Sequence, residues 1–388
     1  MPLRLAICGD GRSPHTQRWA NAFAQRGHGV TVVWRRDQFA GADLSPYDAS
    51  IRHEAVGGDF DPRRPWQQFV AWRKARNLAR ELRPDIVHGL YLQQHGWTAH
   101  DFGVQPLVLS ALGSDVMGME DALPDGLRAH AVGRYIRART RAALRAAEVV
   151  LCDSTDVASR VESLVPGVKT DLVRFGVDPP AADGGDWRER LAIARNAFVV
   201  LSTRLFKSNY NIDVIIEAMP HVLRDVPEAV LVLKEYEPFS DPSYRERCLA
   251  LIDRLGIGSA VRLVGELPPA ELRELYAASD VYVSVPSTDG TAVSIFEAMA
   301  SRIPIVASRA KGIDPAVLND GYSARLVEPG SSDDLSRVLV ALARDDEARG
   351  ALVEQAYVVY EMLGSASSQF DRAERIYRDL LARLGRSA

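Results

Sequence analysis

The chain has 388 residues, of which 47% are apolar and 25% are charged, and its formal net charge is −4. One hydrophobic core does not usually serve a chain of this length, so we expect two or three domains. The slightly acidic balance argues against a dedicated nucleic-acid-binding protein, whose surface is normally basic.

The first half of the chain alternates short apolar runs with segments of helix length. The runs indicate buried strands, and after the first run Trp19 and Phe23 are spaced for one face of a helix that Gly27 closes. No signal-peptide pattern precedes the first run and no apolar stretch has the length of a membrane span, so we expect a cytoplasmic protein. The predicted strands are 3–8, 30–34, 85–90, 106–112 and 149–154.

A linker rich in Pro, Gly, Ala and Asp, residues 179–187, precedes a second alternation of the same kind. The pattern predicts two Rossmann-like α/β domains, an N-terminal one over 1–180 and a C-terminal one over 188–365. The amphipathic segment within 366–388 is expected to pack back on the first domain. Ligands of such sheets bind beyond the carboxyl ends of the strands, so we expect a cleft between the domains. Predicted strands of the second half are 198–204, 229–236, 261–267, 280–285 and 304–308, and predicted helices are 211–224, 242–255, 269–278 and 292–301.

The first strand–helix turn bears on a rival function, that of a dinucleotide-binding dehydrogenase. The turn reads Gly9-x-Gly11-x-x-Pro14. Proline therefore stands where the third glycine of the dinucleotide fingerprint lets the helix pack closely on the strand. This argues against a dehydrogenase.

The segment 286–300 carries two acidic residues around a predicted helix start. Asp289 lies near the tip of the helix, and Glu297 follows a little over two turns later. A helix start offers amides to phosphate or sugar oxygens, and a carboxylate can accept hydrogen bonds from vicinal hydroxyls. In the alternative interpretation Asp289 only caps the helix and Glu297 is a solvated helix residue.

This segment resembles the acidic-x7-acidic motif of the retaining GT-B glycosyltransferases of family 4, with Asp289 in place of the usual glutamate. Other segments resemble that family in the same order, so the likeness covers roughly residues 3–385. It implies the GT-B fold, with two Rossmann-like domains facing each other across a cleft, and a hexosyltransferase that retains the anomeric configuration. The other segments are Pro84–His88, Gly113–Asp115, Phe175–Asp178, Tyr276–Asp280 and Pro304–Ser308.

The resemblance also implies which residues hold the donor, a nucleoside diphosphate sugar. Glu297 would bind the ribose hydroxyls, Asp289 the transferred sugar, and Arg204 the diphosphate, which suits a guanidinium fork. A surface arginine at a strand end is the alternative for Arg204. Gly11 has no Cβ, so its backbone could approach the diphosphate. The candidate donor-binding residues, which include two lysines considered next, are Gly11, His15, Arg204, Lys207, Lys234, Asp289, Gly290, Thr291, Ala292, Val293 and Glu297, with Arg204, Lys234 and Asp289 as the catalytic set.

The chain departs from the family five residues after Arg204, at a position where the family normally has a lysine. Asn209 occupies that position. A second cation is chemically expected, because the diphosphate must leave without protonation by bulk acid. We expect Lys234, at the end of a strand, to supply this charge, with Lys207 as the alternative.

A second departure is Leu112, which stands where many relatives carry a histidine near the transferred sugar. Acceptor-side candidates are then His88, His95 and Asp115, although a histidine such as His88, at the end of an apolar strand, is often a core residue. In a retaining front-face reaction the departing phosphate oxygen can take the acceptor's proton, so a protein base is optional. The alternative is that Leu112 marks altered specificity or loss of activity.

We expect no metal or other cofactor, because the spacing of the three cysteines fits no metal site and no His/Cys cluster occurs. Expected partners are a nucleotide-sugar donor and an acceptor that is a sugar, a lipid-linked sugar or a small molecule, in glycan, glycolipid or glycoconjugate biosynthesis. Two other functions stay open. One is a catalytically degenerate GT-B binding or regulatory protein, and the other is a sugar-nucleotide epimerase.

Two segments of the N-terminal domain are amphipathic and basic. Residues 63–83 combine Trp66, Phe69 and Trp72 at helical spacing with several basic residues, and 128–145 repeats arginine every three to four residues opposite aliphatic side chains. In one interpretation the apolar face of each lies in the domain core and the arginine face in water. In the other, the helices make peripheral contact with an anionic membrane.

Overall fold

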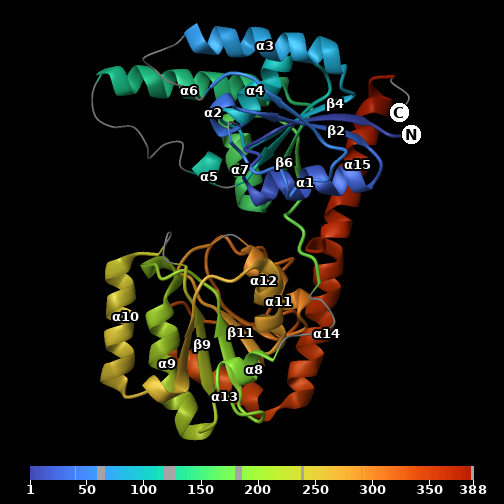
Figure 1. Ribbon diagram of the computed structural model, residues 1–388. Helices are drawn as coiled ribbons and strands as arrows, with labels where there is room; N and C mark the ends of the chain where they lie inside the picture. Colours follow the sequence, from blue (N-terminus) through green and yellow to red (C-terminus); the bar gives the residue numbers. More distant parts are fainter. Residues whose placement is uncertain are drawn as a thin grey trace. The chain divides into compact units, whose positions relative to one another are not determined.

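The computed structural model describes residues 1–39, 41–58, 66–112, 114–117, 127–179, 186–236, 240–289 and 291–385. The chain forms two compact units, Met1–Phe175 together with Gln369–Ala388, and Gly176–Ser368. Each unit is an α/β domain on one parallel sheet, as predicted (Figure 1). Most of the predicted linker, residues 180–185, lies outside the described residues. In the described parts of the chain, no helix combines the length and the apolar character that crossing a membrane requires.

The sheet of the first unit has seven parallel strands in the order β3-β2-β1-β4-β5-β6-β7. The order reverses between β1 and β4, and ligands of doubly wound sheets bind at the carboxyl ends beside such a point. Its strands are β1 (Arg4–Cys8), β2 (Gly29–Trp34), β3 (Arg52–Ala55), β4 (Ile86–Leu90), β5 (Leu107–Ala111), β6 (Val149–Cys152) and β7 (Thr170–Leu172).

Helices cover this sheet on both faces. One core joins the sheet to α3, α4, α6 and α7. On the opposite face Trp19 of α1 contacts Phe370 of α15, and its indole N–H donates to the Tyr377 hydroxyl at 3.1 Å. These contacts fasten the end of the chain to the first unit. The helices are α1 (Pro14–Gln25), α2 (Arg36–Phe39), α3 (Trp66–Leu82), α4 (His95–Phe102), α5 (Ser114–Met117), α6 (Leu127–Ala146), α7 (Thr155–Leu164) and α15 (Ala366–Arg383).

The two basic helices of this unit, α6 and α3, differ in which of their side chains face the core. In α6, Leu144 is buried and Arg141 and Arg145 are exposed, as the core interpretation requires. In α3 that interpretation is wrong for the aromatic side chains, because Trp66 is 61% and Phe69 is 64% exposed. The side of α3 that packs inward is a second apolar stripe of three alanines and a leucine, Ala71, Ala75, Leu78 and Ala79.

The sheet of the second unit has six parallel strands in the order β10-β9-β8-β11-β12-β13. Here the order reverses between β8 and β11, so a ligand site is expected beside the carboxyl ends of these strands. The strands are β8 (Val199–Ser202), β9 (Val230–Lys234), β10 (Val261–Val264), β11 (Val281–Ser284), β12 (Ile305–Ser308) and β13 (Arg325–Val327).

The helices of the second unit form two cores with the sheet. Residues of α9, α10 and α13 pack on one face, and residues of α11, α12 and α14 pack on the other. Sequence signals set their ends. In α10, for example, the Asp241 side chain accepts the amides of Ser243 and Tyr244, and Gly256 ends the helix with φ 67°. The helices are α8 (Trp187–Arg190), α9 (Ile212–Asp225), α10 (Pro242–Leu255), α11 (Pro269–Ala277), α12 (Val293–Ala300), α13 (Ser332–Arg344) and α14 (Asp346–Leu363).

Candidate functional site

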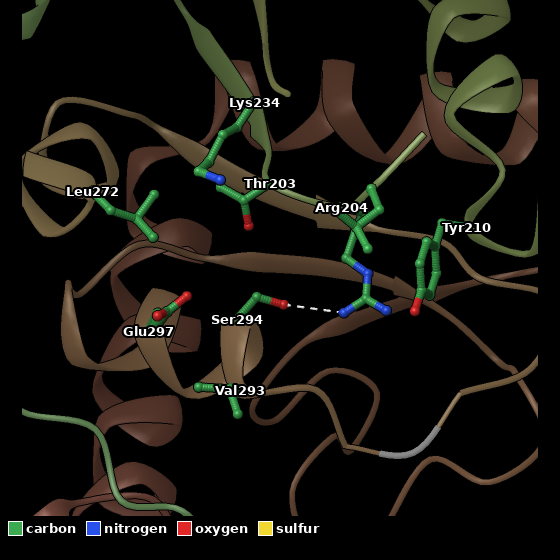
Figure 2. A pocket seen from close by; sticks show the side chains of 9 residues that line it. Thr203, Arg204, Tyr210, Lys234, Leu272, Val293, Ser294 and Glu297 are labelled. Atoms are coloured by element: carbon green, nitrogen blue, oxygen red, sulfur yellow. Dashed lines mark hydrogen bonds between the residues drawn. The ribbon is translucent and has the colours of Figure 1, made fainter. Parts of the chain in front are cut away.

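A hollow opens at the carboxyl ends of β8 and β9 in the second unit (Figure 2). The segments that follow these strands, together with α11 and the start of α12, supply its walls. This is the edge of the sheet at which an open α/β domain binds ligands. The lining residues are Thr203, Arg204, Leu205, Tyr210, Lys234, Leu272, Val293, Ser294 and Glu297.

Arg204 is held on three sides at the edge of this hollow, with 10% of its side chain exposed. Its Nη2 lies 2.5 Å from Oδ2 of Asp289, and its Nη1 donates to the Ser294 hydroxyl at 3.3 Å. Its Cζ lies 4.0 Å from the centroid of the Tyr210 ring. Arg204 is therefore not a solvated surface arginine.

Asp289 lies in the loop between β11 and α12. The N-cap of α12 is Ala292, which provides no side-chain cap, so Asp289 does not cap this helix. The backbone N–H of Asp289 donates to the carbonyl of Lys311 at 3.3 Å, and its carboxylate pairs with Arg204. The loop thus presents the carboxylate to the arginine at the hollow.

Glu297, in the second turn of α12, lines the hollow rather than extending into solvent. Its carboxylate accepts a hydrogen bond from the hydroxyl of Tyr276 at 3.1 Å. That hydroxyl also lies 2.8 Å from Oγ1 of Thr203, and the tyrosine is completely buried. Burial is the main reason that the pKa of Tyr276 is raised well above its ordinary value, so the hydroxyl stays a donor. Glu297 is therefore fixed in orientation.

The start of α12 lies slightly later than predicted, at Val293. Its first-turn amides therefore belong to Val293 and Ser294, whereas Thr291 and Ala292 precede the helix. The Thr291 hydroxyl accepts the backbone N–H of Asp314 at 3.4 Å. The predicted contribution of Gly290 lies outside the described residues.

Lys234 and Lys207, the two candidates for the second cation, lie in different environments. Lys234 ends β9 and lines the hollow. Burial lowers its pKa, while the carboxylates of Glu266 and Glu297 act in the opposite direction. Lys207 is exposed and does not belong to the lining of the hollow. The structure thus brings Lys234 beside Glu297 in the hollow and leaves Lys207 outside it.

In the first unit, the missing Cβ of Gly11 makes room for an internal packing contact. A Cβ at this position would lie 2.1 Å from the ring of Trp34, so the close approach is an internal packing contact. The carbonyl of Gly11 accepts the Tyr47 hydroxyl at 2.6 Å. His15 lies at the start of α1 with its ring centroid 3.9 Å from that of Phe175, and burial lowers its pKa.

His88 lies inside the core of the first unit, which contradicts its place among the acceptor-side candidates. Its Nδ1 lies 2.6 Å from the hydroxyl of Tyr377, and its Nε2 lies 2.7 Å from the hydroxyl of Ser110. Both ring nitrogens are thus engaged, and burial lowers the pKa to about 3. His88 is a neutral structural residue that joins β4 to β5 and α15.

Asp115, the second acceptor-side candidate, connects two loops. Its carboxylate accepts the amides of Leu92 at 2.7 Å and Leu112 at 2.9 Å, beyond the ends of β4 and β5. Burial raises its pKa to about 6. His95, the third candidate, begins α4, and burial together with the charge of Arg35 lowers its pKa to about 4. Within the described ranges, no group of three or more His, Cys, Asp or Glu side chains is placed to hold a metal ion.

Sequence reasoning assigned no role to Tyr210 and Ser294, which line the hollow, or to Tyr276, which is buried and donates to Glu297. Tyr276 belongs to one of the segments on which the family resemblance rests, and Ser294 follows Val293 at a predicted helix start. These signals could have placed both near the site. Nothing in the sequence distinguishes Tyr210 from other tyrosines.

Two family descriptions match consecutive parts of the chain. "Glycosyl transferase 4-like" matches residues 4–154, and "Glycosyl transferases group 1" matches residues 184–359. The two matches divide the chain in the same way as its two α/β units. The second match contains every residue that lines the hollow.

Individual relatives cover the chain to different extents. A GDP-mannose-dependent alpha-(1-6)-phosphatidylinositol monomannoside mannosyltransferase of Mycolicibacterium smegmatis is 29% identical over 57% of this chain, which spans only 54% of that relative. A D-inositol 3-phosphate glycosyltransferase of Streptosporangium roseum is 29% identical over 92% of this chain and 87% of its own length. Among solved structures, Anabaena HepE in complex with UDP and glucose aligns with a TM-score of 0.71 at 18% identity, over 96% of this chain and 99% of its own.

Proposed function

The chain belongs to the group 1 glycosyltransferases and has their GT-B fold, and we propose that it transfers a hexose-type sugar from a nucleoside diphosphate sugar to an acceptor hydroxyl. The observation that carries this proposal is the hollow of the second unit. There the cations Arg204 and Lys234 and the carboxylate of Glu297 line the hollow, and the carboxylate of Asp289 pairs with Arg204 at its edge. A sugar nucleotide requires this combination, because it joins a dianionic diphosphate to two groups rich in hydroxyls.

In the proposed reaction each charged residue has a separate task. The guanidinium of Arg204 and the ammonium of Lys234 would stabilise the negative charge that develops on the departing diphosphate. Glu297, oriented by the Tyr276 hydroxyl, would accept the ribose hydroxyls, and Asp289 would accept hydroxyls of the transferred sugar. Two cations also provide the positive charge for which other transferases use a divalent ion, so we propose that no metal is needed.

We propose that the anomeric configuration is retained. The bond from the anomeric carbon to the diphosphate oxygen would break as the acceptor oxygen approaches from the same face, and the departing oxygen would take the acceptor's proton. The chain's own groups support this route, because His88 and Asp115 are engaged in hydrogen bonds inside the first unit. Catalysis would then depend on positioning and on stabilisation of the leaving group.

The names of the relatives suggest the classes of donor and acceptor. Inositol phosphate and a phosphatidylinositol mannoside are named for two of them, and UDP with glucose for a solved structure. We propose that the acceptor of this chain is a sugar, a polyol or a lipid-linked sugar. Inositol-type or mannosyl-type glycolipid biosynthesis is the setting that these names favour.

The experiment has two stages. Thermal shifts with UDP-, GDP-, ADP- and dTDP-sugars identify the donor, since a ligand at 100 times its dissociation constant adds roughly 2.7 kcal/mol to stability. The transfer of labelled sugar from that donor to inositol phosphate, phosphatidylinositol and simple glycosides is then measured, with and without a chelator. A sugar nucleotide converted to its epimer without any acceptor would identify an epimerase, and donor binding with neither transfer nor hydrolysis would identify a degenerate binding protein.

We further propose that α3 makes peripheral contact with an anionic membrane. Its first half exposes large apolar side chains, and the rings of Phe69 and Trp72 stack with centroids 5.7 Å apart. Its second half presents basic side chains, of which Arg73 and Arg80 are exposed. Aromatic and cationic side chains together on an exposed helix are typical of binding at the surface of anionic lipid. The exposed apolar residues are Trp66, Phe69, Val70 and Trp72.

A further inference from the structure

The segment 207–211, between β8 and α9, has a structure that follows from its departure from the family sequence. It forms a single 3₁₀ turn, Ser208–Tyr210, and Asn211 then adopts the left-handed conformation with φ 51° and ψ 47°. Asparagine tolerates this conformation better than most residues. The turn places the Tyr210 ring in the lining of the hollow and leaves Asn209 exposed.

Asn209 and Asn211 fasten this turn to the loop that carries Asp289. The Asn209 side chain donates to the carbonyl of Thr288 at 2.8 Å and accepts the Thr288 hydroxyl at 3.1 Å. Nδ2 of Asn211 donates to the carbonyl of Val285 at 2.9 Å and to the hydroxyl of Ser287 at 3.0 Å. The position where the family has a lysine is therefore used to hold one loop to the other, and the side chain of Asn209 brings no charge to the hollow.

The contact that this turn makes with Arg204 is of a different kind. Tyr210 packs against the guanidinium, with Cζ of Arg204 4.0 Å from the centroid of the Tyr210 ring. In Figure 2 the guanidinium lies between this ring and the side of the hollow formed by Ser294. A cation–π contact is an attraction between the positive charge and the ring, so it needs no hydrogen-bond acceptor and does not take the place of Asp289 or Ser294.

This difference matters when a diphosphate arrives. A diphosphate that binds Arg204 competes with Asp289 and Ser294 for the Nη groups of the guanidinium. An arginine held only by those two hydrogen bonds would lose its fixed position in the exchange. An arginine that also packs against a ring keeps this contact while its N–H groups exchange partners, and a cation–π contact strengthens as water is excluded.

We propose that Tyr210 is a positioning residue, which holds the guanidinium of Arg204 in place while its N–H groups pass from Asp289 to the diphosphate of the donor. This inference rests on the proposed function, since it takes the ligand of the hollow to be a nucleoside diphosphate. Tyr210 takes over, by packing, part of what the absent family lysine contributes by charge.

The test measures the dissociation constant of a nucleoside diphosphate by calorimetry, with GDP and UDP as probes and the tighter of the two used for all variants. Tyr210→Leu keeps an apolar side chain but removes the ring, and we expect binding to weaken by roughly 3- to 30-fold, the range for a partly desolvated cation–π contact. Tyr210→Phe keeps the ring and is expected to restore most of the affinity. Tyr210 is only half-buried, so both variants are expected to fold, which their melting temperatures check.

A double-mutant cycle with Arg204→Gln separates positioning from direct contact with the ligand. If Tyr210 acts through Arg204, Tyr210→Leu has no further effect on affinity in the Arg204→Gln background. An equal penalty in both backgrounds, a Phe variant as weak as the Leu variant, or a Leu variant that binds like the wild type would each overturn the proposal. A wild-type protein that binds neither GDP nor UDP would instead remove the proposed function on which this inference rests.

Discussion

The carboxylate of Asp289 and the guanidinium of Arg204 form an ion pair of 2.5 Å between residues 85 positions apart in the chain. Under the proposed function the two groups have different ligands, since Arg204 binds the diphosphate and Asp289 binds the transferred sugar. A complete nucleotide sugar that breaks this ion pair gives each residue a new partner, the diphosphate for Arg204 and the transferred sugar for Asp289. A free nucleoside diphosphate lacks the transferred sugar, so it gains Arg204 only in competition with Asp289.

The Asp289→Asn substitution is therefore expected to change binding and turnover in opposite directions. Without the competing carboxylate, a free nucleoside diphosphate should bind about 3- to 10-fold more tightly, in the net range of one ordinary hydrogen bond. The turnover of the sugar nucleotide should fall by about 100-fold, because an interaction with the transferred sugar is lost. Calorimetry with the product nucleotide and an assay of sugar transfer measure the two effects.

Asp320→Asn is a matched control for this substitution, because Asp320 also pairs with an arginine, but that arginine, Arg309, does not line the hollow as Arg204 does. Neither nucleotide affinity nor turnover should change in the control. Weaker nucleotide binding in Asp289→Asn would show that Asp289 does not compete for Arg204.

Lys234 and Lys207 allow a paired test of the second cation. Lys234 lines the hollow and Lys207 is exposed outside it. We expect Lys234→Ala to lower kcat by about 10- to 100-fold, since a charge that stabilises the leaving group is removed, and Lys207→Ala to stay within about two-fold of the wild type. Steady-state kinetics with the identified donor decide between them. Wild-type turnover in Lys234→Ala would exclude Lys234 from this role.

The burial of His88 predicts how stability depends on pH. Its folded pKa of about 3 lies below that of an exposed histidine, so between these values the unfolded chain binds the proton and the folded protein does not. The free energy of unfolding must therefore decrease as pH falls. Between about pH 7 and about pH 5.5 we expect His88 alone to account for about 1 kcal/mol of this loss.

Urea unfolding of the wild type and of His88→Gln at both pH values measures this contribution. The variant should be less stable at neutral pH because it loses the bonds to Tyr377 and Ser110, but its stability should depend less on pH. The comparison of slopes separates proton binding from the loss of contacts. Equal slopes in the two proteins would show that folded His88 takes up a proton in this pH range as readily as it does in the unfolded chain.

Most of the fold could be predicted because its central strands are continuous apolar runs. The three strands absent from the prediction, β3, β7 and β13, all lie at sheet edges. An edge strand has a neighbour on one side only and a partly exposed surface, so short mixed sequences such as Arg52–Ala55 suffice. Such sequences do not differ from loops in their pattern of apolar residues.

The site was predictable where it depends on strand ends and unpredictable where it depends on packing. Arg204 follows the end of β8 by two residues and Lys234 ends β9, the neighbouring parallel strand, so the sequence alone brings them to one edge of the sheet. The burial of His88 depends on Tyr377, a residue 289 positions later on a helix that returns to the first unit. In α3 the sequence offers two apolar stripes, one of aromatic residues and one composed mostly of alanines. The helix packs with the alanine-rich stripe inward, because alanine side chains let it approach the domain closely.

The exposed aromatic side chains of α3 give a direct test of membrane contact. We expect the wild-type protein to co-sediment with vesicles of phosphatidylcholine and phosphatidylglycerol, more weakly with phosphatidylcholine alone, and less as salt screens the basic residues. Replacing Trp66, Phe69 and Trp72 together by alanine should reduce this binding by about ten-fold or more, since large apolar surfaces no longer enter the interface.

Met362→Ala is the control for this experiment, because Met362 is as exposed as Trp66 but lies on α14 in the second unit, so its loss should leave vesicle binding unchanged. The triple variant should also transfer sugar to a water-soluble acceptor at the wild-type rate, because α3 contributes no residue to the lining of the hollow. A rate that falls only with a lipid-linked acceptor would connect membrane contact to acceptor delivery. Equal binding of wild-type and triple-variant proteins to anionic vesicles would remove α3 as the contact surface.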